Sequence, residues 1–165
     1  MFREPRSSHP KVFIHPSVVV KESPIHGWGC FAADDIESNI LIESAPGVIC
    51  HGNTTDALFD VHECRHILQD YPFTWREGYI IFALGYAAVY NHLQDNNCHW
   101  QQNFEYETLE FRTKRKILAG EEITVRYLPV RLKGALWFDD GTGSTMEDAR
   151  EAQTLGKKRL SWKDF

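Results

Sequence analysis

The sequence of 165 residues lacks the marks of several large protein classes. None of its four cysteines belongs to a Cys-x-x-Cys pair, which argues against a structural zinc knuckle and fits reduced thiols. Its N-terminus has no apolar segment typical of a secretory signal. Its longest apolar run is about twelve residues, whereas a helix needs roughly 20 to cross a bilayer. These absences predict a cytoplasmic, single-domain protein without a membrane partner.

Basic residues are scarce in the middle of the chain. Residues 22–110 contain 2 Lys or Arg against 14 Asp or Glu, while residues 111–165 contain 12 against 8. Nucleic-acid phosphates require a basic face, so this distribution argues against a nucleic-acid partner. An acidic surface would instead attract a basic peptide at long range. A merely solvated acidic surface explains the same distribution equally well.

Short β-branched or apolar segments between turns predict a mainly β domain. The expected strands are residues 18–20, 30–32, 40–42, 48–50, 104–111 and 123–128, with Pro46-Gly47 ending the third. One helix is expected from Thr55 or Asp56 to Leu68, and the run 79–90 fits either a strand or a helix. Residues 1–16 are expected to form an extended arm, residues 17–130 the domain and residues 131–165 a C-terminal segment.

Residues 85–97 carry the sharpest change of character in the chain. An apolar run that begins at Tyr79 delivers Asn91 and His92, and a cluster of amides follows. Buried amides and imidazoles need hydrogen-bond partners, so this pair indicates either a site or a polar turn after a buried element.

A second pattern, His62-Glu63-Cys64-Arg65-His66, fits the H-E-x-x-H zinc motif. A catalytic zinc needs a third protein ligand, and no downstream partner has suitable spacing. A solvated helix face is therefore the better interpretation, with a zinc hydrolase on His62 and His66 as the weaker one.

Three separated motifs, taken together, resemble the SET domain of protein lysine methyltransferases. The tract 23–32, with its Gly27-Trp28-Gly29 turn, resembles the first motif of that family. The pattern Asn91-His92-x-x-x-x-Asn97 resembles the second family motif. Residues 116–127, which end in Tyr127, resemble the last one. The stretch 85–92 is most similar to small, free-standing SET proteins of bacteria and viruses; a viral member would act in the host cytoplasm.

The resemblance implies a mainly β, β-clip-like fold with short curved sheets and one or two short helices. It also implies a C-terminal pseudoknot, in which the last motif threads beside Asn91-His92. S-adenosylmethionine is the implied cofactor, and a protein substrate that carries a lysine, expected to be basic, is the implied partner. A homodimer is one of the oligomeric states left open.

The resemblance also implies residue roles. The cofactor would be held by His26, Gly27, Trp28, Gly29, Asn91 and His92. Tyr127 would be the catalytic tyrosine. The substrate channel would be lined by Tyr86, Tyr90, Trp100 and Val125, and closed by Trp137-Phe138 from the C-terminal segment.

Several positions depart from the family pattern. Leu93, Gln94 and Asn96 replace the Ser, Cys and Pro of the middle motif, and Val125 stands where an aromatic residue is frequent. The size of that residue influences how many methyl groups are added, so the product state stays open. These departures motivate an alternative hypothesis, a catalytically inactive SET module that binds a protein.

Overall fold

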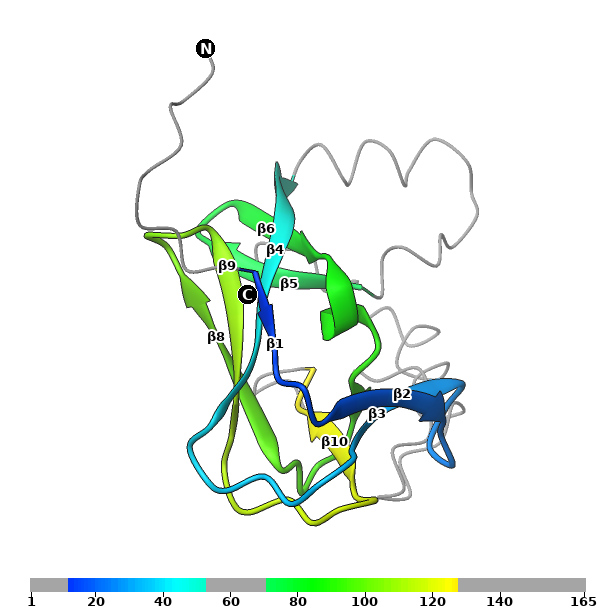
Figure 1. Ribbon diagram of the computed structural model, residues 1–165. Helices are drawn as coiled ribbons and strands as arrows, with labels where there is room; N and C mark the ends of the chain where they lie inside the picture. The colour runs from blue at the N-terminus through cyan, green and yellow to red at the C-terminus, as the bar shows by residue number, and fades with distance from the viewer. Residues whose placement is uncertain (1–11, 53–70, 128–165) are drawn as a thin grey trace, which may run out of the picture.

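The computed structural model describes residues 12–52 and 71–127, and these residues form curved β-sheets (Figure 1). The expectation of a mainly β fold is confirmed. The elements are β1 (Phe13–Ile14), β2 (Val18–Glu22), β3 (Trp28–Ala32), β4 (Leu41–His51), β5 (Pro72–Arg76), β6 (Tyr79–Ala83), the 3-10 helix η2 (Gly85–Ala88), β7 (Asn91–His92), β8 (Cys98–Asn103), β9 (Thr108–Thr113) and β10 (Glu122–Val125).

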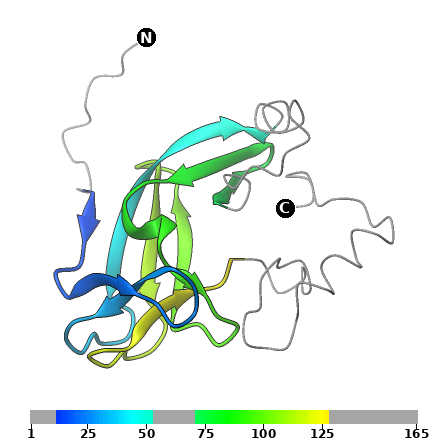
Figure 2. The same ribbon diagram turned by 90° about the vertical axis from the view of Figure 1, so that its right-hand side faces the viewer.

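The larger sheet is built around β4, and its strand order is β5-β6-β4-β9-β8. The first half of β4 pairs with β9, and β1 adds to its other side at residues 43–44. The second half pairs with β6 from Gly47 onward. Figure 2 shows the resulting strong curvature of β4. A single bent strand therefore connects two hairpins, β5–β6 and β8–β9.

The smaller sheet has the order β2-β3-β10-β7. β10 is antiparallel to β3 and parallel to β7, with Thr124 opposite Asn91 and Val125 opposite His92. Figure 1 shows β10 beside β3, although these strands are far apart in the sequence. This insertion of the last described strand beside Asn91-His92 is the arrangement expected from the family resemblance.

One apolar core joins the two sheets. The large sheet contributes Ile42, Leu109 and Phe111, and the small sheet contributes Ile123 and Val125. All five side chains are completely buried. Because β10 supplies two of them, its insertion is supported by apolar burial as well as by backbone hydrogen bonds.

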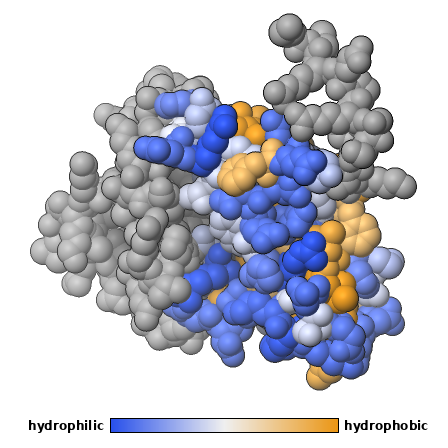
Figure 3. Space-filling model, turned by 90° about the vertical axis from the view of Figure 1, so that its left-hand side faces the viewer, coloured by the Kyte–Doolittle hydropathy of each residue, from blue (hydrophilic) through white to orange (hydrophobic). Residues whose placement is uncertain are grey.

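Figure 3 shows a face of the molecule on which hydrophilic side chains dominate and hydrophobic ones occur in small groups. Isolated apolar side chains on a surface are ordinary. The described ranges contain no helix of the length and apolarity needed to cross a membrane.

Several details differ from the sequence-based expectations. Pro46-Gly47 does not end a strand, because β4 changes its neighbour there: Pro46 is the last partner of β9 and Gly47 the first partner of β6. The ambiguous run 79–90 divides into strand β6 and helix η2. The strand expected at 104–111 is a turn followed by β9, and Glu107 has a φ of 58° in that turn.

Two further strands were not predicted. β8 begins at Cys98, and β5 begins at Pro72, where the end of a helix was expected. Residues 13–14 of the expected arm form β1 because they pair with β4. The helix expected at 55–68 lies outside the described residues.

Asn97 ties β10 to the preceding loop. Its carboxamide accepts the Thr124 N–H at 2.9 Å and donates to the Glu122 carbonyl at 2.7 Å, and Asn97 is only 2% exposed. Asn97→Ala should lower the free energy of unfolding by about 2–3 kcal/mol, because it leaves buried backbone groups without partners. Urea denaturation checks this, with the exposed Gln101→Ala as the control expected to change stability by less than ~0.5 kcal/mol. Equal losses for both variants would contradict the role assigned to Asn97.

Candidate active site

The side chain of Asn91 is the meeting point of three segments. Its Nδ2 lies 3.1 Å from the His26 carbonyl oxygen, 3.1 Å from the Trp28 carbonyl oxygen and 2.8 Å from Glu122 Oε1. An amide nitrogen has only two hydrogens for these three acceptors. The site is therefore rich in acceptors and suited to a positively charged donor.

Ser23 and Glu122 support the turn that carries these carbonyl groups. The Ser23 hydroxyl contacts both carboxylate oxygens of Glu122, at 2.9 and 2.8 Å, and accepts the Ile25 N–H at 2.9 Å. Gly29 lies against the same carboxylate, and a Cβ at this position would overlap it. A side chain is thus excluded where the turn and β10 make their closest approach.

His92 is oriented by the backbone of Tyr127. The Tyr127 N–H donates to His92 Nδ1 at 3.0 Å, and the ring is 2% exposed. A neutral imidazole that accepts at Nδ1 carries its proton on Nε2. The rings of His92 and Tyr127 lie with their centroids 5.4 Å apart.

The hydroxyl of Tyr127 donates to the Tyr90 carbonyl oxygen at 2.7 Å. Burial raises the pKa of Tyr127 well above its ordinary value, and the nearby groups of Tyr71, Glu122 and Cys30 raise it further. Tyr127 therefore keeps its proton at neutral pH. It is a hydrogen-bonding group at the site and not a base.

The residues predicted to line a channel occupy two kinds of position. Tyr90 and Val125 are completely buried in the core, and the ring of Tyr90 packs 4.9 Å from that of Phe111. Tyr86 on η2 and Trp100 on β8 are half-buried. The Trp100 indole donates to the Arg126 carbonyl at 3.1 Å, next to Tyr127.

The structure thus brings together the predicted residues His26, Gly27, Trp28, Gly29, Asn91, His92 and Tyr127. Sequence analysis did not identify Ser23 or Glu122. The sequence offered one signal for a carboxylate at the site, the Glu121-Glu122 pair in the last motif. Glu121 is partly exposed and forms an ion pair with Arg115. Which glutamate faces the site follows from the register of β10 with β3.

These residues fit the cofactor that the resemblance implies. A methionine ammonium group needs acceptors, and two backbone carbonyls with one carboxylate already converge there. Trp28 is 67% exposed, so its indole is accessible on the outside of the turn. The acceptors of the site match the ammonium group of an amino-acid ligand.

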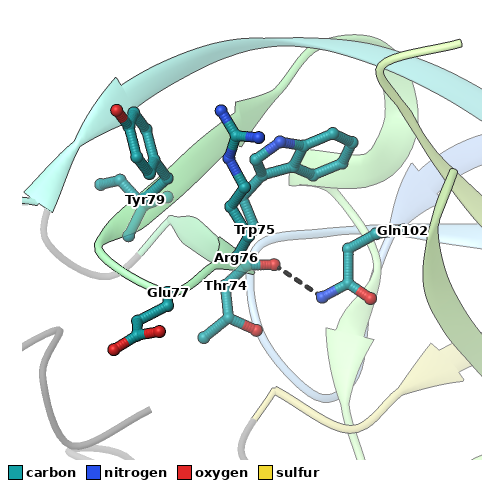
Figure 4. Close-up of a pocket in the computed structure, with 7 residues that line it drawn as sticks. Thr74, Trp75, Arg76, Glu77, Tyr79 and Gln102 are labelled. Atoms are coloured by element: carbon teal, nitrogen blue, oxygen red, sulfur yellow. Dashed lines mark hydrogen bonds between the residues drawn. The ribbon is translucent and has the colours of Figure 1, made fainter. Parts of the chain in front are cut away.

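A separate pocket of about 200 Å³ lies at the β5–β6 hairpin (Figure 4). Its wall includes Trp75, Arg76 and Tyr79, and the Gln102 amide donates to the Thr74 carbonyl at 3.0 Å. None of the predicted site residues lines it.

His62, His66, Trp137 and Phe138 lie outside the described residues. Within residues 12–52 and 71–127, no group of three or more His, Cys, Asp or Glu side chains is arranged to hold a metal ion.

Comparison with known proteins supports the resemblance to the SET domain. The family model for the SET domain matches residues 27–128. The chain is 25% identical over 131 residues to a fission yeast (Schizosaccharomyces pombe) histone-lysine N-methyltransferase specific for H3 lysine 37, covering 79% of this chain and 83% of that protein. It is 30% identical over 112 residues to the Arabidopsis thaliana histone-lysine N-methyltransferase ATXR7, which covers 65% of this chain but only 8% of that protein.

Solved structures show the same fold. A Plasmodium falciparum protein described as a candidate histone methyltransferase superposes with a TM-score of 0.54 at 23% identity, over 70% of this chain and 96% of its own. A chain of the Chaetomium thermophilum Polycomb Repressive Complex 2, in a humanized mutant with a bound inhibitor, also gives 0.54 at 23% identity. That match covers 67% of this chain and 14% of the other.

Ser23 and Glu122 should act as a coupled pair. In a double-mutant cycle of Ser23→Ala and Glu122→Gln, we expect a coupling energy of about 1 kcal/mol or more, because the two side chains share two partly buried hydrogen bonds. Urea denaturation of the four proteins gives this value. The exposed pair Gln101 and Glu110, 3.2 Å apart, is the matched control and should couple by less than ~0.5 kcal/mol. Additive effects of the Ser23 and Glu122 variants would contradict the coupling.

Proposed function

This chain belongs to the SET-domain family, and we propose that it is an S-adenosylmethionine-dependent protein-lysine N-methyltransferase. One observation carries the proposal: hydrogen bonds join the 26–29 turn, Asn91-His92 and Tyr127 into one site. Lysine methyltransferase activity is also supported by the histone-lysine methyltransferases to which the chain is similar.

We assign cofactor binding to His26, Gly27, Trp28, Gly29, Asn91 and His92. The carbonyl groups of His26 and Trp28, with Glu122, would accept from the ammonium group of S-adenosylmethionine. When bound, the cofactor supplies an electrophilic methyl group on a positively charged sulfur. Asn91 orients the turn, and the backbone of β7 holds Asn91 and His92 against β10.

The target lysine must be neutral to react, and free lysine has a pKa of ~10.4. Removing its proton at pH 7 therefore costs roughly 4–5 kcal/mol. An apolar, aromatic surrounding lowers this cost because it disfavours the ammonium form. Tyr127, which donates its own proton to the Tyr90 carbonyl, can accept a hydrogen bond from the lysine amine and align it. No strong base is required of the chain.

We propose that Tyr86, Tyr90, Trp100 and Val125 surround this lysine. Val125 is completely buried directly before the Arg126-Tyr127 segment, so its size would limit the room for methyl groups. The acidic balance of residues 22–110 favours a basic protein segment as substrate. The histone specificity named for the yeast relative is of the same chemical class.

Tyr127→Phe tests the catalytic assignment. Loss of the hydroxyl should lower the methyl transfer rate by roughly 100-fold, because it removes a hydrogen-bonding group from the site. Transfer of radiolabelled methyl groups to core histones measures the rate. Tyr106→Phe, in the turn before β9, is the matched control and should retain full activity. Full activity of the Tyr127 variant would refute the assigned role.

Isothermal titration with S-adenosylmethionine tests the cofactor site. We expect saturable binding to one site, and a loss of at least about tenfold in affinity for Asn91→Ala, because the turn loses its anchor. The control is Asn103→Ala. Asn103 ends β8, and its side-chain amide donates a hydrogen bond to Glu110. Circular dichroism confirms that both variants fold.

The same titration separates active enzyme from inactive module. Binding without transfer to any lysine-rich protein would favour the inactive protein-binding module over the enzyme. Absence of binding at millimolar cofactor would contradict the cofactor assignment itself.

A further inference from the structure

Glu43 is a buried carboxylate in the middle of the large sheet. It lies on β4, between its partners Ile14 on β1 and Phe111 on β9, and is 3% exposed. A charged group is rarely buried between apolar neighbours unless several hydrogen bonds hold it. The contacts of the Glu43 carboxylate therefore indicate its role.

The carboxylate of Glu43 accepts N–H groups of η2. Oε1 accepts the Tyr86 N–H at 2.9 Å, and the Ala87 N–H faces the same carboxylate and lowers its pKa. The preceding Gly85 has a φ of 82°, and a Cβ there would lie 2.7 Å from Glu43 Oε1. Glycine allows both this backbone conformation and the close approach of the carboxylate.

The same carboxylate faces the hydroxyl of Tyr90. Glu43 Oε2 and the Tyr90 hydroxyl are both buried and make no hydrogen bond of regular geometry among the described residues, and the hydroxyl acts on the carboxylate as a donor that lowers its pKa. Two buried polar atoms in this situation are best satisfied by each other. Tyr90 is then held at its hydroxyl by Glu43, while its carbonyl oxygen holds the Tyr127 hydroxyl at 2.7 Å.

Glu43 is the group of this cluster that titrates near neutrality. Burial raises the pKa of Glu43 from 4.5 to about 7, against the opposing effects of the Tyr90 hydroxyl and the Tyr86 and Ala87 N–H groups. The other titratable groups that face it are Tyr90, Cys30 on β3 and Cys98 on β8. Burial raises the pKa of all three, so they stay neutral.

The sign of the effect on stability follows from this shift. A carboxyl whose folded-state pKa is raised stabilises the fold at low pH, and this stabilisation is lost as the pH rises through about 7. Above that pH the ionised form is present, and it offers two oxygens and a negative charge to the three donors that face it. The ionised form of Glu43 therefore orders η2 and Tyr90 best, but it also lowers the stability of the fold.

We propose that Glu43 is a positioning residue for methyl transfer: its ionised carboxylate fixes η2 and the Tyr90 side chain, and so places the Tyr90 carbonyl oxygen that holds the Tyr127 hydroxyl. This inference rests on the proposed methyltransferase activity. It adds a residue that has no contact with cofactor or substrate and acts through Tyr90.

Glu43→Gln separates this role from a merely structural one. We expect kcat to fall roughly tenfold above pH 8, because a small displacement of the Tyr127 hydroxyl misaligns the reacting groups. The KM values for cofactor and substrate should change less than twofold. Thermal stability at pH 8 should be equal to or higher than that of the wild type, since the buried charge is gone.

The decisive measurement is the ratio of wild-type to variant kcat between pH 6 and 9.5. Lysine deprotonation affects both proteins equally and cancels in the ratio. The ratio should rise from near 1 at pH 6 to a plateau of roughly ten, with a midpoint near the pKa of Glu43. Glu110→Gln, a hydrogen-bonded carboxylate on β9, is the matched control and should give a constant ratio near 1.

Each outcome decides one claim. A ratio that does not change with pH, from a wild type that transfers methyl groups, would overturn the role of Glu43 alone. Absence of transfer by the wild type at every pH would overturn the proposed function and this role together. If Glu43→Gln does not fold, Tyr90→Phe replaces it. Loss of that hydroxyl should move the midpoint of the wild-type pH profile to higher pH, and an unchanged midpoint would overturn the proposal.

Discussion

The insertion of β10 between β3 and β7 is the constraint on which the site depends. This insertion brings together three widely separated parts of the chain: the 26–29 turn, Asn91-His92 and Tyr127. Apolar burial of Ile123 and Val125 holds the strand in place, and Asn97 fixes its register through the backbone of residues 122 and 124. A register shift of one residue would move the Glu122 side chain to the opposite face of the strand and away from Asn91.

In the proposed methyltransferase, the site so formed would work through orientation and not through proton transfer by a strong base. Tyr127 stays protonated, and His92 already accepts a backbone N–H at Nδ1. His92 and the Tyr127 hydroxyl are each hydrogen-bonded to the backbone, and these bonds fix their positions. A displacement at a positively charged methyl donor needs alignment and a neutral nucleophile, and groups held in place by the fold would supply the alignment.

The residues that meet at the candidate site were easier to identify from the sequence than the strands that carry them. Gly27-Trp28-Gly29, Asn91-His92 and Tyr127 are local motifs, and local motifs can be read without knowing what lies beside them. The continuous β4 could not be predicted, because Pro46-Gly47 is a normal strand ending unless the strand changes its neighbour there. Ser23, Glu43 and Glu122 were missed for a related reason: each depends on a partner far away in sequence, and a lone carboxylate in a strand gives no signal of burial.

Glu43 illustrates how the geometry of one short helix dictates the chemistry beneath it. The first N–H groups of any helix have no partner within the helix, and here those of Tyr86 and Ala87 point inward together with the Tyr90 hydroxyl. Three donors exceed what the single carbonyl oxygen of a glutamine accepts well, whereas a carboxylate offers two oxygens and a charge. Raising its pKa from 4.5 to about 7 corresponds to a destabilisation on the order of 3 kcal/mol once the group is ionised. A fold that tolerates this cost next to the Tyr90 side chain favours an ordered site over maximal stability, a compromise that proteins often make at functional positions.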